Sequence, residues 1–434
     1  MKRVLKNLRE LLPLGAREAS VVFSGDVLAK SLTFLITLSM MDLLTPDEYK
    51  LYGLFITVLA AVNQFTDSGL HQSFIRFSAL YRRTDHARAL AHFHFALRAK
   101  ILIVLLTAVL LYWGSDWIGA TLLRTPALVT PIRVMTIAII GGGMMEFILA
   151  VLQARQQFVR FTAVRISEAA IKTGAIYAGI FLGSFSLMLV YTSYAAAPLI
   201  VGIIAVWFVS SRGGTGGGYD WRDIGREIWA FGKWMMITSF ATMFLMRLDI
   251  FMISPMLDDY EAGLYIAAAK LCTPLIVLAG SVSTVFFPKA MELRSLEEMR
   301  RYVRRTFSVS LPVTGMGLLY LLAMYFITPV YFDKYTASMP LFAVLFIGYA
   351  WTIIGNPLTM LMLSINRARI ATYVALGQLL LTVVSHYYFI TVMGSMGAAI
   401  SSVLVWFIAG MVSMLYIYRH RHEIVNATRT ERTL

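Results

Sequence analysis

The sequence contains very little cysteine and little charge for its length. Its 434 residues include one cysteine, Cys272, which lies in an apolar stretch, so a disulfide framework and a cysteine-based metal site are excluded. Charged residues make up 14% and hydrophobic residues 58%, against about 25% and about 45–50% in soluble domains. The mean hydropathy is +0.71. This composition predicts a polytopic membrane protein, in which a bundle of spanning helices replaces a globular core.

Acidic residues are also scarce, and the net charge is +14. Basic residues gather in alternate loops, as membrane topology demands, which argues against a nucleic-acid partner. The basic N-terminus runs into a long apolar stretch without a small-residue cleavage site, so we expect it to be uncleaved and cytoplasmic. The segment MELRSLEEMRRYVRR (residues 291–305) is amphipathic and is expected to lie on the cytoplasmic surface near acidic lipid.

Stretches of about 20 mostly apolar residues predict an all-α protein with twelve transmembrane helices. The predicted spans are residues 19–41, 50–68, 94–113, 131–153, 163–183, 187–209, 231–255, 263–288, 307–330, 339–364, 370–392 and 397–418. The loops after even-numbered spans are rich in Lys and Arg, whereas the other loops hold at most one such residue. By the positive-inside rule, both termini are cytoplasmic.

A glycine-rich run divides the chain into two predicted lobes. SRGGTGGGYDWRDIGRE lacks the Gly-Lys-Ser/Thr ending of a phosphate-binding loop, so we interpret it as a flexible linker. The predicted parts are a cytoplasmic N-terminus at 1–18, an N-lobe at 19–210, a linker at 211–229, a C-lobe at 230–418 and a cytoplasmic tail at 419–434.

Several motifs, in their order and spacing, resemble one family of membrane proteins. In the first half they are LLTPDEYKLYG, TDSGLHQSFIRF and LQARQQFVRF, and in the second half RLDIFMI, GLYIAAAKL, VFFPKAMEL, NPLTMLMLSINRAR and MGSMGAAISSVL. Together they resemble the polysaccharide-repeat exporters, the O-antigen and exopolysaccharide flippases of the multidrug/oligosaccharidyl-lipid/polysaccharide superfamily. The resemblance covers residues 20–418.

The resemblance implies a two-lobed, MATE-like flippase of the bacterial inner membrane. Such a protein moves undecaprenyl-diphosphate-linked oligosaccharide repeat units from the cytoplasmic to the periplasmic leaflet by alternating access, with ion coupling. It catalyses no chemical reaction. Its expected partners are the lipid-linked oligosaccharide, membrane lipids, a polysaccharide polymerase and a chain-length regulator. Neither a cofactor, a metal nor a nucleic acid is expected.

Five charges inside the N-lobe spans are predicted to form two neighbouring layers. A charge at the bilayer centre must face protein or water, so we expect these side chains to point into the bundle. Counted from the periplasmic ends, Lys30 and Lys172 lie about 16 Å deep and Asp26, Glu146 and Glu168 about 22 Å deep. Asp26 with Lys30 and Glu168 with Lys172 have the i,i+4 spacing of local ion pairs. One interpretation is therefore a set of structural pairs.

The other interpretation is a hydrated site for the lipid head group. In it Lys30 and Lys172 meet the diphosphate, Arg165 receives it first, and Glu146 takes up a proton or cation, with Asp26 and Glu168 in the same layer. A second polar set, Asn63, Asp67 and His71, follows one face of its helix. That set fits helix capping and packing, or an Asp and a His that respond to pH and ions.

The C-lobe carries Arg247, Asp249 and Lys270, all about 9–12 Å from the periplasmic face. In a regular helix the i,i+2 spacing separates Arg247 from Asp249. We expect Arg247 to hold the diphosphate in bidentate fashion, on a path between the lobes, and Asp249 to pair with Lys270. The alternative is an interhelical salt bridge of Arg247 itself.

Other polar residues and other functions carry less weight. Asn356, Gln378 and His386 are predicted to be helix-packing groups. A proton- or sodium-coupled drug exporter of the same superfamily is the main alternative, although the buried cations weigh against a cationic drug. A membrane enzyme of polysaccharide assembly would need a catalytic constellation at an aqueous face, and the non-cytoplasmic loops are too short to supply one.

Overall fold

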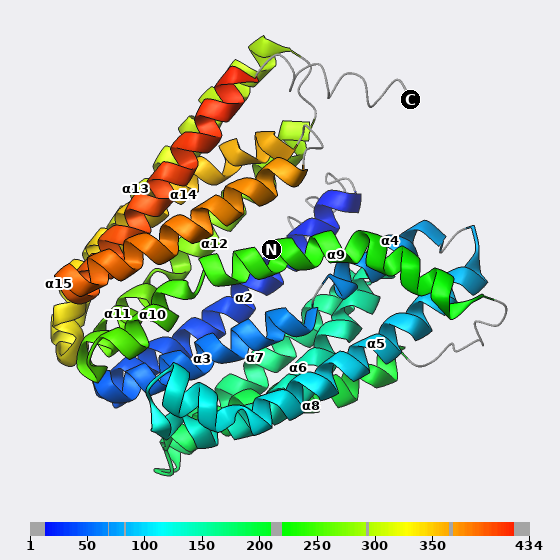
Figure 1. Ribbon diagram of the computed structural model, residues 1–434. Helices are drawn as coiled ribbons and strands as arrows, with labels where there is room; N and C mark the ends of the chain where they lie inside the picture. Colours follow the sequence, from blue (N-terminus) through cyan, green and yellow to red (C-terminus); the bar gives the residue numbers. More distant parts are fainter. Residues whose placement is uncertain are drawn as a thin grey trace, which may run out of the picture. The chain divides into compact units, whose positions relative to one another are not determined.

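The structure is a computed structural model that describes residues 14–67, 69–81, 84–209, 219–291, 295–363 and 368–420. Throughout these residues the chain is helical, and they contain no strand (Figure 1). Every predicted span lies mainly in helix, apart from residues 68 and 364, which are not described. The fold class inferred from composition is therefore confirmed, while the count of twelve and the cytoplasmic termini stay predictions.

The first part of the chain folds into helices joined by short turns, with a π-helical turn and a 3-10 turn before α6. They are α2 (Leu14–Leu43), α3 (Pro46–Asp67), α4 (Leu70–Tyr81), α5 (His86–Trp113), η1 (Trp117–Leu122), η2 (Pro126–Leu128), α6 (Val129–Ala154), α7 (Phe158–Phe181), α8 (Leu187–Val209) and α9 (Trp221–Leu245). The predicted linker is thus helical from Trp221 onward, and its residues up to 218 lie outside the described ranges.

The second part has fewer and longer helices. They are α10 (Leu248–Met256), α11 (Asp259–Leu271), α12 (Thr273–Met291), α13 (Leu296–Tyr331), η3 (Asp333–Ser338), α14 (Met339–Leu363) and α15 (Ala368–Arg419). The amphipathic segment expected on the membrane surface forms the first turns of α13, apart from Met291, which ends α12, and residues 292–294, which are not described.

Within the described ranges, eight helices are long and apolar enough to cross a membrane, or nine if the bent pair α9–α10 forms one span. The charge-bearing helices α3 and α7 are not among the eight, because their internal charges lower their hydropathy. Many apolar side chains of the eight helices are exposed, for example Leu102 of α5 and Leu319 of α13, each 68% exposed. The chain is a multi-pass membrane protein, since such faces are compatible with lipid and not with water.

Two predicted continuous spans are broken in the structure. Residues 239–245 of α9 meet α10 at a bend of 46°, and Arg247, at φ −140°, is the residue directly before α10. The span predicted at 263–288 divides at Cys272 into α11 and α12. Pro274 explains this second break, because it has no N–H to donate to the carbonyl of residue 270.

The predicted spans 370–392 and 397–418 are joined in α15 by a single non-helical residue. Gly394 has φ +59° and ψ −140°, a conformation that favours glycine. A Cβ there would also meet the carboxylate of Glu261, which accepts a hydrogen bond from the backbone N–H of Ser395 at 3.4 Å. This short joint is therefore held from the first turn of α11.

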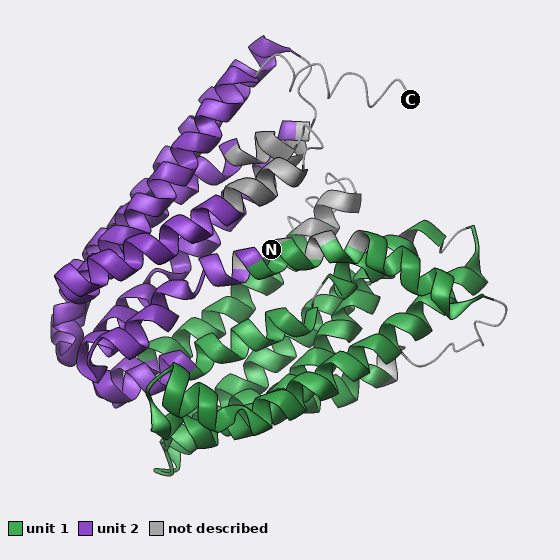
Figure 2. Ribbon diagram, in the orientation of Figure 1, with its two compact units in different colours: residues 1–38, 55–240 green, residues 39–54, 241–434 purple. Residues whose placement is uncertain are grey.

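The chain divides into two compact units, residues 1–38 with 55–240 and residues 39–54 with 241–434 (Figure 2). Residues 39–54 belong to the second unit because buried Lys50 pairs with Asp259 at 2.6 Å and Tyr335 donates to the carbonyl of Leu44 at 3.0 Å. In unit 1 α6 packs on α8, and in unit 2 α14 packs on α15. The predicted lobe limits, 19–210 and 230–418, differ from these units at both boundaries and stay predictions.

Candidate functional site

Six helices of unit 1 bring ionisable side chains together in what we name the unit 1 charged cluster. It comprises Asp26 of α2, Asp67 of α3, His71 of α4, Lys100 of α5, Glu146 of α6, and Arg165, Glu168 and Lys172 of α7. All but Lys100 were singled out from the sequence. The cluster holds four carboxylates and three permanent cations, with one imidazole.

The most buried cation of this cluster, Lys100, pairs with Asp67. Lys100 is 3% exposed, and its ammonium lies 3.1 Å from Oδ1 of Asp67 and 3.1 Å from the carbonyl oxygen of Thr66. Sequence reasoning missed this lysine, although it lies inside the predicted span 94–113, where an unpaired lysine is costly. The Asp67–Lys100 pair therefore connects α3 to α5.

Next to this pair lie two groups that can exchange a proton. One ligand-type atom each from Asp67, His71 and Glu146 lies within 4.8 Å of the others, and Nδ1 of His71 is 3.8 Å from Asp67. Glu146 forms no ion pair with any described residue, although Asp67, Arg165 and Lys100 act on it electrostatically. Since the Lys100 ammonium already neutralises Asp67, the cluster fits an added proton better than a divalent metal.

Asp26 has a different partner from the one the spacing suggested. It pairs with Arg165 of α7 at 2.5 Å, whereas Lys30 is exposed and forms no ion pair with a described residue. The predicted local pair of Asp26 and Lys30 is therefore not formed. Helices α2 and α7 approach closely here because position 25 is glycine, where any Cβ would collide with Thr162.

Glu168 and Lys172 form the local pair that their spacing predicts, at 2.8 Å. Lys172 is 7% exposed, and its ammonium also lies 4.5 Å from the ring centroid of Tyr194 on α8. A carboxylate on one side and an aromatic face on the other stabilise a lysine in an apolar surrounding. This charge is consequently satisfied within unit 1.

A second polar group in unit 1 fastens α9 to α5. Glu227 of α9 pairs with Arg88 and, at 3.0 Å, with Nε2 of His92, whose side chain is fully buried. Just before these helices, the Tyr219 hydroxyl donates to Asp85. That hydrogen bond lowers the pKa of the Asp85 carboxyl from its usual 3.8, because it stabilises the ionised form. Sequence reasoning missed these contacts, since they join residues more than 130 positions apart.

In unit 2 the residues Arg247, Asp249 and Lys270 lie near one another without forming an ion pair. All three are half-buried, and each acts electrostatically on its neighbours. Asp249 accepts a hydrogen bond from the buried hydroxyl of Tyr265 at 2.9 Å, and its other carboxylate oxygen is buried without a partner among the described residues. The predicted pair of Asp249 with Lys270 is therefore replaced by a tyrosine contact.

Hydrogen bonds extend this site from Asp249 to a buried histidine. The Tyr265 hydroxyl lies 3.5 Å from Ser402, Ser402 lies 3.2 Å from Nε2 of His386, and Ser401 lies 2.9 Å from Nδ1. His386 is 1% exposed, so it packs between helices as predicted but is also linked to the carboxylate. Asn356 is exposed and Gln378 half-buried. We name Arg247, Asp249, Lys270, Tyr265 and His386 the unit 2 site.

Comparison with known proteins supplies the family. A family described as "Polysaccharide biosynthesis protein" matches residues 40–340, more than half of the chain. The chain belongs to this family. The matched segment includes Lys100, Glu146 and Arg247 but ends before His386, so the core of both charged sites lies within the polysaccharide biosynthesis protein family's own region.

One relative and two solved structures extend the comparison. A candidate O-antigen transporter of Shigella flexneri is 24% identical over 186 residues, which cover 41% of this chain and 43% of the relative, less than half its length. The lipid II flippase MurJ in an inward closed conformation has a TM-score of 0.75 at 13% identity, covering 94% of this chain and 90% of MurJ. An inward-facing multidrug resistance MATE family transporter of the MOP superfamily has a TM-score of 0.71 at 12% identity, covering 93% and 96%.

These comparisons confirm the resemblance found in the sequence motifs and the MATE-like fold class. At such low identity the structural neighbours establish the fold alone. The relatives named above are transporters or flippases and not enzymes. For this member of the polysaccharide biosynthesis protein family, the activity has to be argued from the charged side chains.

Proposed function

We propose that this protein is an inner-membrane flippase that moves undecaprenyl-diphosphate-linked oligosaccharide repeat units from the cytoplasmic to the periplasmic leaflet by alternating access, coupled to protons. Family membership, the candidate O-antigen transporter and the lipid II flippase among the structural neighbours support a lipid-linked cargo. Protein partners expected for the family, a polymerase and a chain-length regulator, belong to the same proposal.

The observation that carries the proposal is the state of Arg247. A guanidinium inside a spanning segment costs about 2.5–3.5 kcal/mol on insertion scales unless an anion accompanies it. Arg247 has Asp249 in electrostatic reach, but it forms no ion pair with a described residue, and Lys270 adds a second cation nearby. The unit 2 site thus carries two cations for one carboxylate, which suits a diphosphate.

Backbone geometry supports the same role for this residue. Arg247 stands where α9 ends and α10 begins, and broken helices in transporters commonly mark substrate sites. Its fork of N–H donors can bind phosphate oxygens in bidentate fashion. Lys270 lies in the last turn of α11, where the released carbonyls favour a cation. In unit 2 we assign Arg247 and Lys270 to head-group binding. In unit 1 the exposed Lys30 is a separate candidate for contact with a head group.

Arg165 and Lys172 are weaker candidates for cargo binding than their depth suggested. Arg165 already pairs with Asp26 and Lys172 with Glu168. A diphosphate at either cation would compete with the carboxylate already paired there. We therefore assign these two pairs to the framework that positions Glu146, and keep Arg165, which is 37% exposed, as a first contact for the head group.

Coupling is assigned to the carboxylates that lack a full counter-charge. In unit 1, Glu146 beside His71 and Asp67 can take up one proton, since carboxylates this close repel each other when both are ionised. In unit 2, Asp249 is linked through Tyr265 to His386. Proton exchange at these groups would change the charge that the cargo meets, which is the requirement for coupled transport.

The proposal is tested by export in a strain that lacks the native gene. Arg247→Gln should lower export about 10- to 100-fold, because charged hydrogen bonds contribute about 1.5–3 kcal/mol. The matched control is Arg133→Gln, which removes an exposed ion pair with Asp116 at 2.8 Å and should leave export unchanged. Protein abundance in the membrane is measured for both variants.

Two further readouts separate cargo binding from coupling. Lipid-linked oligosaccharide should accumulate on the cytoplasmic side in the Arg247→Gln strain, and its absence from a deletion strain would exclude a flippase. In Glu146→Gln we expect export that no longer responds to an imposed pH gradient. Full gradient dependence in this variant would exclude Glu146 as the coupling group.

A drug exporter is less well supported. A cavity for cationic drugs needs unpaired carboxylates. Among the described residues Glu146 in unit 1 is such a group, but the unit 2 site has an excess of cations. Resistance to cationic dyes in cells overproducing the protein, with no effect on polysaccharide, would favour this alternative.

A further inference from the structure

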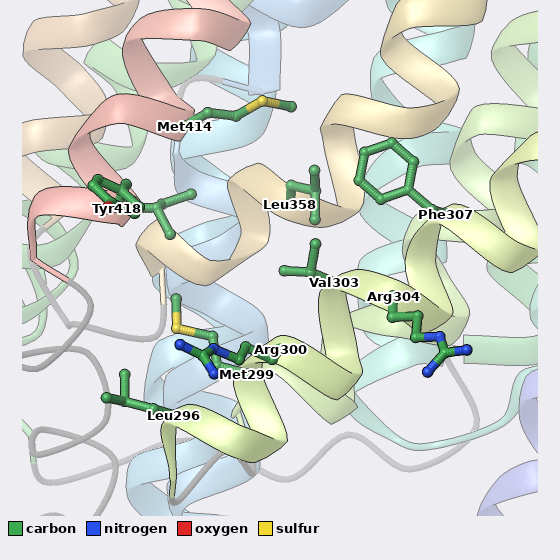
Figure 3. A pocket seen from close by; sticks show the side chains of 10 residues that line it. Leu296, Met299, Arg300, Val303, Arg304, Phe307, Leu358, Met414 and Tyr418 are labelled. Carbon is green, nitrogen blue, oxygen red and sulfur yellow. The ribbon is translucent and has the colours of Figure 1, made fainter.

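A pocket of about 530 Å³ lies in unit 2 where α13, α14 and α15 meet (Figure 3). It is lined by Leu296, Met299, Arg300, Val303, Arg304, Phe307, Leu358, Met414, Ile417 and Tyr418. Figure 3 shows Val303, Phe307 and Leu358 turned toward one another, with two arginines beside them. None of these residues belongs to the charged sites described above.

The sequence of α13 explains why this face is apolar. Its lining residues recur at helical spacing from Leu296 to Phe307, so they form one stripe along the helix. The floor is closed by side chains that are almost fully buried: Met299 at 7%, Leu358 at 5% and Ile417 at 7%. The pocket is thus an apolar groove on a packed core and not a gap in loose structure.

Two hydrogen bonds fix α13 against α14 beneath the groove. Pro357 has no N–H, so the carbonyl of Ile353 loses its helical partner, and the Ser310 hydroxyl donates to it at 3.2 Å. The Tyr302 hydroxyl donates to the carbonyl of Pro357 at 2.6 Å. Both contacts are buried and hold Leu358 in place on the wall of the groove.

Arg300 and Arg304 supply the only formal charges on the lining. Both are exposed, and neither forms an ion pair with a residue that the structure describes. Their neighbour Arg301 faces away from the pocket and pairs with Glu297 at 3.3 Å. The same helix therefore offers two available guanidiniums at the groove and a paired one outside it.

The position of these arginines along α13 matches the head-group region of a bilayer. The helix has 36 residues and is about 54 Å long, against about 30 Å of hydrocarbon. Counted back from the exposed aromatic end at Tyr331, the hydrocarbon ends near Leu311, and Arg304 lies about 10 Å beyond. Long arginine side chains can reach the phosphate layer from there.

We propose that this groove binds an anionic phospholipid of the surrounding bilayer, with its phosphate on Arg300 and Arg304 and an acyl chain that runs over Phe307, Leu358 and Met414 toward the hydrocarbon. The groove continues into exposed apolar surface on the same helices, such as Leu311 at 57% and Leu415 at 53%, which is where bilayer lipid lies. Apart from the arginines, only Tyr418 offers an oxygen or nitrogen on its side chain, so the lining has few hydrogen-bonding groups for an oligosaccharide.

The experiment measures lipid binding by the full-length protein in detergent micelles. Phosphatidylglycerol is titrated against phosphatidylcholine, with binding read by native mass spectrometry and by thermal stabilisation. In Arg300→Gln/Arg304→Gln, affinity for phosphatidylglycerol should fall about 25-fold, which is about fivefold for each basic residue near an anionic surface. Phosphatidylcholine binding should change little.

Two further variants control for charge and for folding. Arg301→Gln removes a charge one residue away and should keep the preference for phosphatidylglycerol. Met414→Trp fills the groove and should weaken both lipids, while its unfolding midpoint without lipid reports that it is folded. Equal affinity of the double arginine variant and the wild type for phosphatidylglycerol would overturn the proposal.

Competition separates this site from others with similar chemistry. Inorganic phosphate should not displace the bound lipid, and displacement by phosphate at millimolar concentration would show a free-anion site instead. Selective binding of a polyprenyl diphosphate, with no preference between the two phospholipids, would show that the groove takes cargo and would likewise overturn the proposal. The export defect of Arg247→Gln is independent of all these outcomes.

Discussion

Removing one partner of the Asp67–Lys100 pair should destabilise the protein strongly. Asp67→Asn leaves the Lys100 ammonium, 3% exposed, with the carbonyl of Thr66 at 3.1 Å and no paired carboxylate. A buried charge left without its partner costs about 3–5 kcal/mol. Lys100→Met should cost less, about 1–3 kcal/mol, because Asp67 is 29% exposed and can be hydrated.

The double variant Asp67→Asn/Lys100→Met should recover most of this loss. Replacing both members of a buried pair by groups of similar volume is often neutral or stabilising, since the desolvation of two charges no longer opposes folding. The two changes should therefore be strongly non-additive, with a coupling of about 2 kcal/mol or more.

The assay is the unfolding midpoint of purified protein in a single detergent. The exposed pair of Arg133 and Asp116, 43% and 67% exposed, provides the reference, for which Arg133→Gln should cost at most about 1 kcal/mol. If Asp67→Asn shifts the midpoint no more than this reference, the assignment of a buried pair is refuted. Export by the stable double variant then decides the role of Asp67: normal export would make the pair structural only.

Two further outcomes follow from hydrogen bonds away from the charged sites. Tyr219→Phe should lower stability at neutral pH. This difference from the wild type should vanish as the pH falls below 3.8 through the lowered pKa of Asp85, because a protonated carboxyl no longer gains from the hydrogen bond. A stability difference that persists at low pH would contradict this cause. Ser310→Ala should cost about 1–3 kcal/mol by leaving the carbonyl of Ile353 unpaired, and Pro357→Ala, which restores an N–H, should reduce that cost when the two changes are combined.

The limits of sequence reasoning follow from what local spacing encodes. The i,i+4 spacing of Glu168 and Lys172 was enough to predict their ion pair, because both residues lie on one regular helix. Asp26 has the same spacing to Lys30, yet it pairs with Arg165, 139 residues away. Asp26 follows Gly25, where α2 lies close to Thr162 of α7, and the local spacing does not encode this contact between helices.

Helix continuity sets a second limit. The break at Cys272 has a visible cause in Pro274, so it could have been predicted. The break at Arg247 lies in FLMRLDIF, where neither glycine nor proline occurs, and hydropathy alone makes this stretch one span. The sequence analysis placed Arg247 and Asp249 on different sides of one regular helix. In the structure the helix is interrupted at Arg247, so that argument does not apply. Arg247 itself is nevertheless the residue that the sequence analysis selected.

The joint at Gly394 also bears on how the protein is made. Synthesis proceeds from the N-terminus, so α11 is complete well before the last hairpin of the chain leaves the ribosome. The backbone N–H of Ser395 finds its acceptor on Glu261, 134 residues earlier. When the final two apolar stretches insert, the carboxylate of Glu261 is already present to accept the hydrogen bond at the joint between them.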